Sequence, residues 1–327
     1  MTDNKITMPQ IDAAPHIARR DGITEIMGSV ALALLPASLF GIYMFGLPSL
    51  AMLLVSVASC MLFEWIFIKM FGNAGKLSDL SAVVTGILLA MNLPPSAPLW
   101  LPVVGSLVAM LLGKHVFGGI GSNPFNPALV ARVFLLIAWP AQMSTFARHR
   151  FMADSETGAT PLSILKTDGM GALQNSALFD HYRCAMGYIG GSLGEISAVA
   201  LLIGALFLFI RGYIKWQVPF AFIAAFIIPI AIAWKLDPST YADPLFHFLT
   251  GGLILGAFFM ATDMVTSPMT TRGQLIFGAG CGLVTAAIRL FGSYPEGVSF
   301  AILFMNALTP AIDRLCPTKP NTQGKRE

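Results

Sequence analysis

Residues 49–71 read SLAMLLVSVASCMLFEWIFIKMF, and only Glu64 and Lys69 carry a charge in this run. About 20 consecutive apolar residues, wound as an α-helix, span the roughly 30 Å hydrocarbon layer of a bilayer. A helix also satisfies its own backbone hydrogen-bonding groups inside that layer. The stretch therefore predicts a transmembrane helix, and the rest of the chain is interpreted on the same scale.

The composition of the whole chain agrees with this interpretation. The 327 residues are 55% hydrophobic and 11% charged, and the mean hydropathy is +0.71. Soluble domains carry about 25% charged residues. The net charge is only +3, and the basic residues form no stripe interleaved with aromatic side chains, which argues against nucleic-acid binding. We therefore expect an all-α polytopic membrane protein.

Ten apolar stretches have lengths near that of a bilayer crossing. They lie near residues 23–46, 49–71, 79–93, 98–117, 127–146, 187–210, 216–234, 244–261, 273–291 and 297–315. The third stretch is short and ends at an Asn-Leu-Pro-Pro sequence, and the eighth is rich in glycine. The sequence thus predicts about ten transmembrane helices, some of them interrupted.

A weak internal similarity predicts a repeat. Residues 85–89 (TGILL) in the third stretch resemble residues 250–255 (TGGLIL) in the eighth. Five stretches separate the two copies, so the second copy would be inverted relative to the first. Inverted repeats of five helices occur in transporters, with binding sites at the interface of the halves. Chance similarity between helices rich in glycine and leucine is the alternative.

The chain is accordingly divided into five segments. These are an N-terminal segment 1–22, a first five-helix half 23–146, a polar loop 147–186, a second five-helix half 187–315 and a C-terminal tail 316–327. Lys and Arg concentrate in the short loops on the side of both termini. Because basic loops stay in the cytoplasm, both termini are expected there and the polar loop on the opposite side.

The polar loop contains a candidate attachment site at Thr160, within residues 154–161 (DSETGATP). One interpretation is structural: Thr160 is the N-cap of a short helix that begins at Pro161 and runs to Lys166. The functional interpretation is that the hydroxyl, flanked by the small residues Gly158 and Ala159, accepts a phosphate-linked group. The two interpretations are compatible.

Further polar residues are predicted on the cytoplasmic side. Asn123 and Asn126 lie in a glycine- and proline-rich segment between two stretches, and Asp263 follows the eighth stretch. The simpler interpretation is an interhelical turn and a helix cap. The functional interpretation is that two neutral amides and one carboxyl bind a second cofactor, since neutral groups cost less to desolvate than charges.

Glu64 and Arg132 lie inside apolar stretches, and they are candidates for an intramembrane ion pair or an ion path because charge is costly in lipid. Glu64 is five positions from Lys69, so extension of its side chain to the membrane surface is the alternative. The four cysteines are far apart and the histidines lack the spacing of ligands, so we expect no metal or haem site.

These motifs carry a resemblance to a known family. Residues 154–160 resemble the flavinylation motif Asp-x-x-Ser/Thr-Gly-Ala-Thr of bacterial electron-transport subunits. The segments 123–129 (NPFNPAL) and 259–263 (FMATD) are similar to sequences shared by members of the NqrB/RnfD family. The resemblance covers nearly the whole chain. The N-terminal region of this chain is short, whereas that of NqrB is usually longer, so the chain resembles the RnfD (RsxD) branch more closely.

The resemblance implies a cofactor and an assembly. A dedicated flavin transferase would join FMN to Thr160 through a phosphoester, with Asp154, Thr157, Gly158 and Ala159 completing the motif. A second flavin, riboflavin, would bind without a covalent bond, and the fold would be that of urea transporters. Family members belong to a six-subunit complex of the bacterial inner membrane that includes a periplasmic flavoprotein subunit. The complex passes electrons between NADH and ferredoxin and moves Na⁺ or H⁺.

We therefore expect an electron-carrying subunit without catalytic activity of its own. A secondary transporter or channel for a small polar solute is the alternative from another class, because a fold does not determine function. A structural membrane scaffold is the third interpretation. The sequence does not indicate which ion moves, the direction of electron flow, the flavin potentials or the helices that contact other subunits.

Overall fold

A computed structural model describes residues 22–71, 77–146, 159–176 and 179–317. These residues form helices, turns and irregular segments, and they contain no β-strand. Six helices are long and apolar enough to cross a membrane, counting the continuous run from residue 100 to 117 as one of them. The prediction of an all-helical membrane protein is thus confirmed. Three residues of the predicted motif, Asp154, Thr157 and Gly158, lie outside the described residues.

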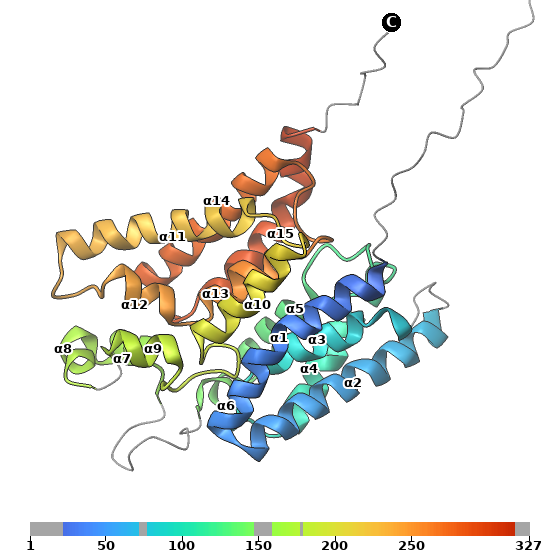
Figure 1. Ribbon diagram of the computed structural model, residues 1–327, viewed down its shortest axis with the longest axis horizontal. Coiled ribbons are helices and arrows are strands. Elements are labelled where there is room, and N and C mark those ends of the chain that lie inside the picture. The colour runs from blue at the N-terminus through green and yellow to red at the C-terminus, as the bar shows by residue number, and fades with distance from the viewer. Residues whose placement is uncertain (1–21, 72–76, 147–158, 177–178, 318–327) are drawn as a thin grey trace, which may run out of the picture.

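The helices before residue 147 form the first half of the bundle (Figure 1). They are α1 (Ile23–Phe45), α2 (Leu47–Phe71), η1 (Leu77–Asp79), α3 (Ser81–Met91), α4 (Trp100–Leu111), η2 (His115–Phe117), α5 (Pro127–Ala138) and α6 (Pro140–Ser144). Helix α2 packs on both α3 and α4, and α4 packs on α5.

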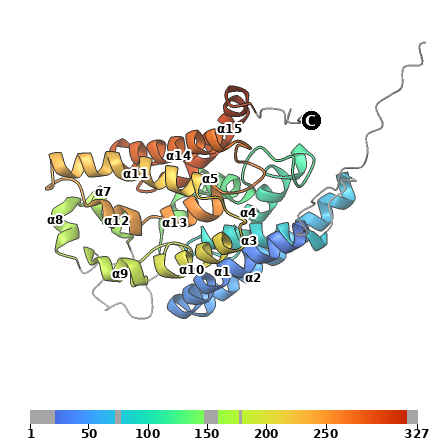
Figure 2. The same ribbon diagram turned by 45° about the horizontal axis from the view of Figure 1, so that its top comes forward.

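The helices after residue 197 form the second half. They are α10 (Ala198–Ile210), α11 (Gln217–Leu236), α12 (Pro244–Leu249), α13 (Leu253–Leu255), the π-helical turn η4 (Gly256–Met260), α14 (Thr271–Phe291) and α15 (Val298–Leu315). Helix α11 packs along α14, and α14 packs on α15. Between the halves, three short helices gather at one end of the bundle beside α12 (Figure 2). They are α7 (Pro161–Thr167), α8 (Gly169–Gln174) and α9 (His181–Met186).

The two halves meet where α1 crosses α10. A methyl group added at Gly204 of α10 would overlap the carbonyl oxygen of Ala33 in α1, so only glycine permits this approach. Phe222, Phe226 and Phe277, from α11 and α14, are fully buried in the same core as Ala33. Large aromatic side chains from one half and small residues at the crossing therefore join the halves into a single apolar core.

Several predicted spans are shorter or more broken than the apolar pattern indicated. The predicted span 187–210 is helical only from Ala198. In the preceding segment, the Gly194 amide donates to the carbonyl of Met91, the last residue of α3. The Leu193 amide donates to the carbonyl of Leu93, two residues after α3 ends. These bonds satisfy non-helical backbone inside the protein, which apolar surroundings require.

The predicted span 244–261 is divided into three pieces. Gly251 and Gly252 separate α12 from α13, and both have positive φ angles, 72° and 65°, which favour glycine. The predicted span 127–146 likewise separates at Trp139 into α5 and α6, with Pro140 beginning the second helix. The sequence therefore identified these regions, and the glycines of the eighth stretch agree with the interruption that was predicted. The non-helical start of 187–210 and the break at Trp139 were not predicted.

Candidate functional site

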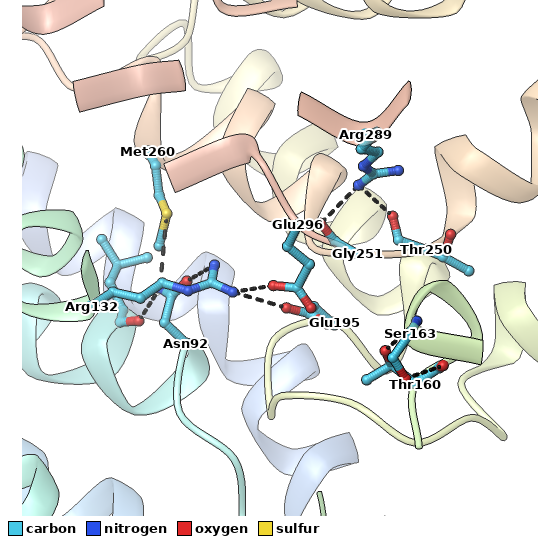
Figure 3. Close-up of polar contacts among 11 residues, drawn as sticks. Asn92, Arg132, Thr160, Ser163, Glu195, Thr250, Gly251, Met260, Arg289 and Glu296 are labelled. Atoms are coloured by element: carbon cyan, nitrogen blue, oxygen red, sulfur yellow. Dashed lines mark hydrogen bonds and ion pairs between the residues drawn. The ribbon is translucent and has the colours of Figure 1, made fainter. Parts of the chain in front are cut away.

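Thr160 is the N-cap of α7, as one of the two sequence interpretations predicted. Its Oγ1 accepts a hydrogen bond of 3.1 Å from the amide of Ser163, and Ser163 Oγ donates to the Thr160 carbonyl at 2.8 Å (Figure 3). The residue is 4% exposed. Pro161 occupies the first helical position, where its missing N–H costs nothing. The hydroxyl is therefore held at a defined point by the start of the helix.

A cavity of about 290 Å³ opens beside Thr160. Its wall includes Asn92, which follows α3, Arg132 of α5, and Tyr294 and Glu296, which lie between α14 and α15. Three distant parts of the sequence thus enclose the space that Thr160 borders. The volume is close to the lower end of the 300–1,000 Å³ range common for small-molecule sites.

Arg132 organises the polar side of this cavity (Figure 3). One guanidinium nitrogen donates to Asn92 Oδ1 at 2.8 Å. The other donates to Glu195 Oε1 at 3.4 Å and forms an ion pair with Glu296. The side chains of Arg132, Glu195 and Glu296 are 12%, 4% and 15% exposed. One cation therefore faces two largely buried carboxyl groups.

The three residues predicted to bind a second cofactor lie around another cavity, of about 130 Å³. Asn126 is the N-cap of α5: its Oδ1 accepts from the amides of Ala128 and Leu129. Asn123 Nδ2 donates to the Phe125 carbonyl at 3.1 Å. The structural interpretation of this segment as a turn and cap therefore holds, and both amides also border the cavity.

Asp263 borders the same cavity. Its carboxylate accepts hydrogen bonds from the amide of Val265 at 3.3 Å and from Thr266 Oγ1 at 3.4 Å. Burial raises the pKa of the Asp263 carboxyl above its ordinary value, although these two hydrogen bonds lower it. Burial therefore favours the neutral carboxyl group, and the two hydrogen bonds favour the carboxylate.

The two cavities approach each other at Met260, the last residue of η4. Asn92 Nδ2 lies 3.8 Å from Met260 Sδ, and Asn126 Nδ2 donates to the Met260 carbonyl at 3.4 Å. Asn92 borders the cavity of Thr160 and Asn126 borders the other. A single residue of a π-helical turn therefore connects the walls of both sites, and such turns often occur at functional sites.

Glu64 and Arg132, the predicted intramembrane pair, are not paired with each other. Glu64 instead lies 2.6 Å from Lys114 Nζ and 3.0 Å from His115 Nε2. The alternative, in which the Glu64 side chain extends to the membrane surface, is wrong because Glu64 is 1% exposed. Lys69 lies over the ring of Trp65. Helical spacing within one stretch could not reveal partners from the segment that follows α4.

Sequence reasoning missed Glu195, Glu296 and Arg289. Arg289 donates to the carbonyls of His247, Thr250 and Gly251, and so occupies the break between α12 and α13 (Figure 3). Cations favour the carbonyl end of a helix. Glu195 and Arg289 both lie inside predicted apolar stretches. A charged residue within an apolar stretch is a signal of function, and a search of every stretch for such residues would have identified both.

Comparison with known proteins adds an independent finding. The chain matches the NQR2, RnfD, RnfE family over residues 10–322. It is 44% identical to the D subunit of the Na⁺-translocating ferredoxin:NAD⁺ oxidoreductase complex of Acetobacterium woodii, covering 93% of this chain and 92% of the relative. It is 41% identical to the D subunit of the proton-translocating ferredoxin:NAD⁺ oxidoreductase complex of Clostridium ljungdahlii, over 97% and 96%. The D subunit of the ion-translocating oxidoreductase complex of Stutzerimonas stutzeri is 41% identical, over 94% and 93%.

Proposed function

Because the chain belongs to the NQR2, RnfD, RnfE family, we propose that it is the flavin-carrying membrane subunit of an ion-translocating ferredoxin:NAD⁺ oxidoreductase complex. Relatives that match it over more than nine-tenths of its length are named as the D subunits of such complexes. The chain contributes to a reaction completed by its partners and has no catalytic activity alone. Its place is the bacterial inner membrane, with both termini cytoplasmic and Thr160 periplasmic.

One observation carries the proposal of a tethered cofactor: the hydroxyl of Thr160 is fixed by α7 and borders a cavity of about 290 Å³. A flavin transferase would attach FMN there through a phosphoester. Arg132 and Tyr294 of the cavity wall would supply positive charge and a phenolic hydroxyl to an attached flavin. The flavin supplies the redox chemistry, and the chain supplies orientation, hydrogen bonds and exclusion of water.

A second flavin, riboflavin, is proposed in the cavity of Asn123, Asn126 and Asp263. The wall there is mainly apolar, with two amides and one carboxyl that would meet the polar edge of an isoalloxazine ring. At about 130 Å³ this cavity is smaller than ordinary ligand sites, so side chains at its margin, such as Met27, would move when a ring binds. Met260, between the cavities, would then separate the two flavins.

The ten-helix inverted repeat is part of the same proposal. Each half has a long second helix that packs on the third and fourth helical segments of that half, α2 on α3 and α4, and α11 on α12 and α14. The third segment is short in the first half, where α3 has 11 residues, and divided in the second, where it forms α12, α13 and η4. These parallels support an arrangement like that of urea transporters, in which redox change at the flavins biases two conformations and so moves Na⁺ or H⁺.

A solute transporter or channel is the rival function, supported by the interrupted helices alone. Peptide mass spectrometry of the chain purified from its native membrane separates the two. We expect the peptide containing Thr160 to carry the mass of FMN. An unmodified peptide, from membranes that contain the flavin transferase, would contradict the redox proposal, and solute movement in vesicles would then favour transport.

The second flavin has its own test in Asn126→Asp. This change keeps the oxygen that caps α5 and removes the NH₂ group that donates to the Met260 carbonyl, while it adds a carboxyl to an apolar cavity. In the proposed site the same NH₂ group would also donate to the flavin. The loss of that hydrogen bond in a buried site costs about 1–3 kcal/mol, so we expect acid-extractable flavin to be bound on the order of tenfold more weakly. Covalent flavin should be unchanged.

The matched control is Thr160→Val, which should lose covalent flavin and keep the extractable flavin. Equal retention of extractable flavin in Asn126→Asp and in the unaltered chain would place the second flavin elsewhere.

A further inference from the structure

Three charged side chains converge beside the cavity of Thr160 from distant parts of the chain. Arg132 belongs to α5, Glu195 to the irregular segment before α10, and Glu296 to the turn before α15. The guanidinium contacts both carboxyl groups, as Figure 3 shows. Both carboxyl groups contact the same guanidinium nitrogen of Arg132, so their oxygens lie close to each other. Two carboxyl oxygens form a hydrogen bond only when one of them carries a proton.

Arg132 contacts the pair directly, and a second cation acts on it with no hydrogen bond or ion pair to either carboxyl group among the described residues. Arg132 supplies one positive charge for two carboxyl groups. Arg289 is the next cation that acts on both, and its guanidinium is occupied by the carbonyls of His247, Thr250 and Gly251. Beyond it lies Lys166, which donates to the Arg289 carbonyl. Like charges in contact at a buried site cannot both remain ionised without a large cost.

A further polar group lies at the same place. Ser192 borders the cavity and is 2% exposed, and its hydroxyl acts on the Glu195 carboxyl group. A hydroxyl can donate to an ionised carboxylate or accept from a protonated carboxyl group. Ser192 can therefore serve Glu195 in either protonation state.

The Glu195 side chain is also confined. A methyl group added at Gly252 would lie 3.2 Å from its Cγ, and one at Gly191 would lie 3.4 Å from its Oε2. The backbone of both glycines therefore lies close to the Glu195 side chain and leaves it little free space there.

We propose that Glu195 and Glu296 hold one exchangeable proton between them, as a proton site on the wall of the Thr160 cavity. Arg132 stays charged and positions both carboxyl groups. The pair can release or take up that proton when the charge in the cavity changes, with no movement of the helices. The site deepens the proposed function, but the shared proton depends only on the three side chains and not on an attached flavin.

Infrared spectroscopy of the whole complex tests the proposal. We expect a carbonyl band of a protonated carboxyl group that shifts in D₂O and disappears as the pH is raised. Both Glu195→Gln and Glu296→Gln should abolish the band, because either change leaves one carboxylate paired with one guanidinium. The control is Glu64→Gln, which should keep the band because Lys114 and His115 already pair with Glu64.

The same measurement on Thr160→Asn separates this proposal from the tethered flavin, since the band should persist there. A band that only one of the two Gln variants removes would mean a single protonated carboxyl, and would overturn the sharing. If the unaltered complex shows no such band, Glu195 and Glu296 are both ionised and hold no proton. If the spectrum of the pair changes with Na⁺ concentration and not with pH, the two carboxyl groups bind a cation. Either result would overturn the proposal. If either variant fails to assemble, the pH titration of the unaltered complex decides.

Discussion

Thr160→Val should abolish the covalently bound flavin of this chain. When the protein is expressed with the flavin transferase, denatured and separated on a gel, the unaltered chain should fluoresce under ultraviolet light and the variant should not. Valine has the shape of threonine and lacks the hydroxyl oxygen that would form the phosphoester. The cavity beside residue 160 would keep its volume, so the loss would follow from the missing oxygen.

The helix cap is the confounding factor, because Thr160 Oγ1 also accepts from the Ser163 amide. Loss of an N-cap costs about 0.5–2 kcal/mol. Thr160→Asn controls for loss of the cap, since asparagine caps helices at least as well as threonine and offers no oxygen for a phosphoester. This variant should also show no flavin fluorescence. Ser163→Ala, which removes the neighbouring hydroxyl, should stay fluorescent. Fluorescence in Thr160→Asn, or its loss in Ser163→Ala, would place the attachment elsewhere.

The sequence predicted the fold where apolar length alone decides structure. The predicted helices 23–46 and 49–71 agree with α1 and α2 to within two residues at each end. The prediction failed for residues 187–197, which are mostly buried but not helical. There the backbone bonds to the end of α3, and a hydropathy pattern contains no information on a partner about 100 residues away.

In the candidate site, too, contacts between nearby residues could be predicted, and most contacts between distant elements could not. The cap at Thr160 could be predicted because its partner, Ser163, is three residues away. The grouping of Asn126 with Asp263 was inferred from a shared membrane side, and one cavity brings them together. The partners of Glu64 and Arg132 could not be inferred, because they come from separate elements and depend on how helices pack.

Glu64→Ala should destabilise the folded chain by about 3–5 kcal/mol, the usual cost of removing one partner of a buried ion pair. Lys114 would keep only its hydrogen bond to Ser81 Oγ, at 2.7 Å, while its side chain remains 4% exposed. His115 would lose its carboxylate partner as well. Denaturant unfolding of the purified protein in detergent measures the change in the free energy of unfolding.

A double-mutant cycle distinguishes this from loss of packing. The single change Glu64→Gln keeps the volume of the side chain and leaves the buried ammonium of Lys114 without a carboxylate, so it should also cost several kcal/mol. Adding Lys114→Met to Glu64→Gln removes that unpaired charge and should recover much of the loss. A Glu64→Gln variant that is as stable as the double variant would mean that the ion pair adds nothing beyond volume. The double variant also tests the proposed ion path: if Glu64 conducts ions, a stable double variant should assemble and transfer electrons, yet translocate no Na⁺ or H⁺.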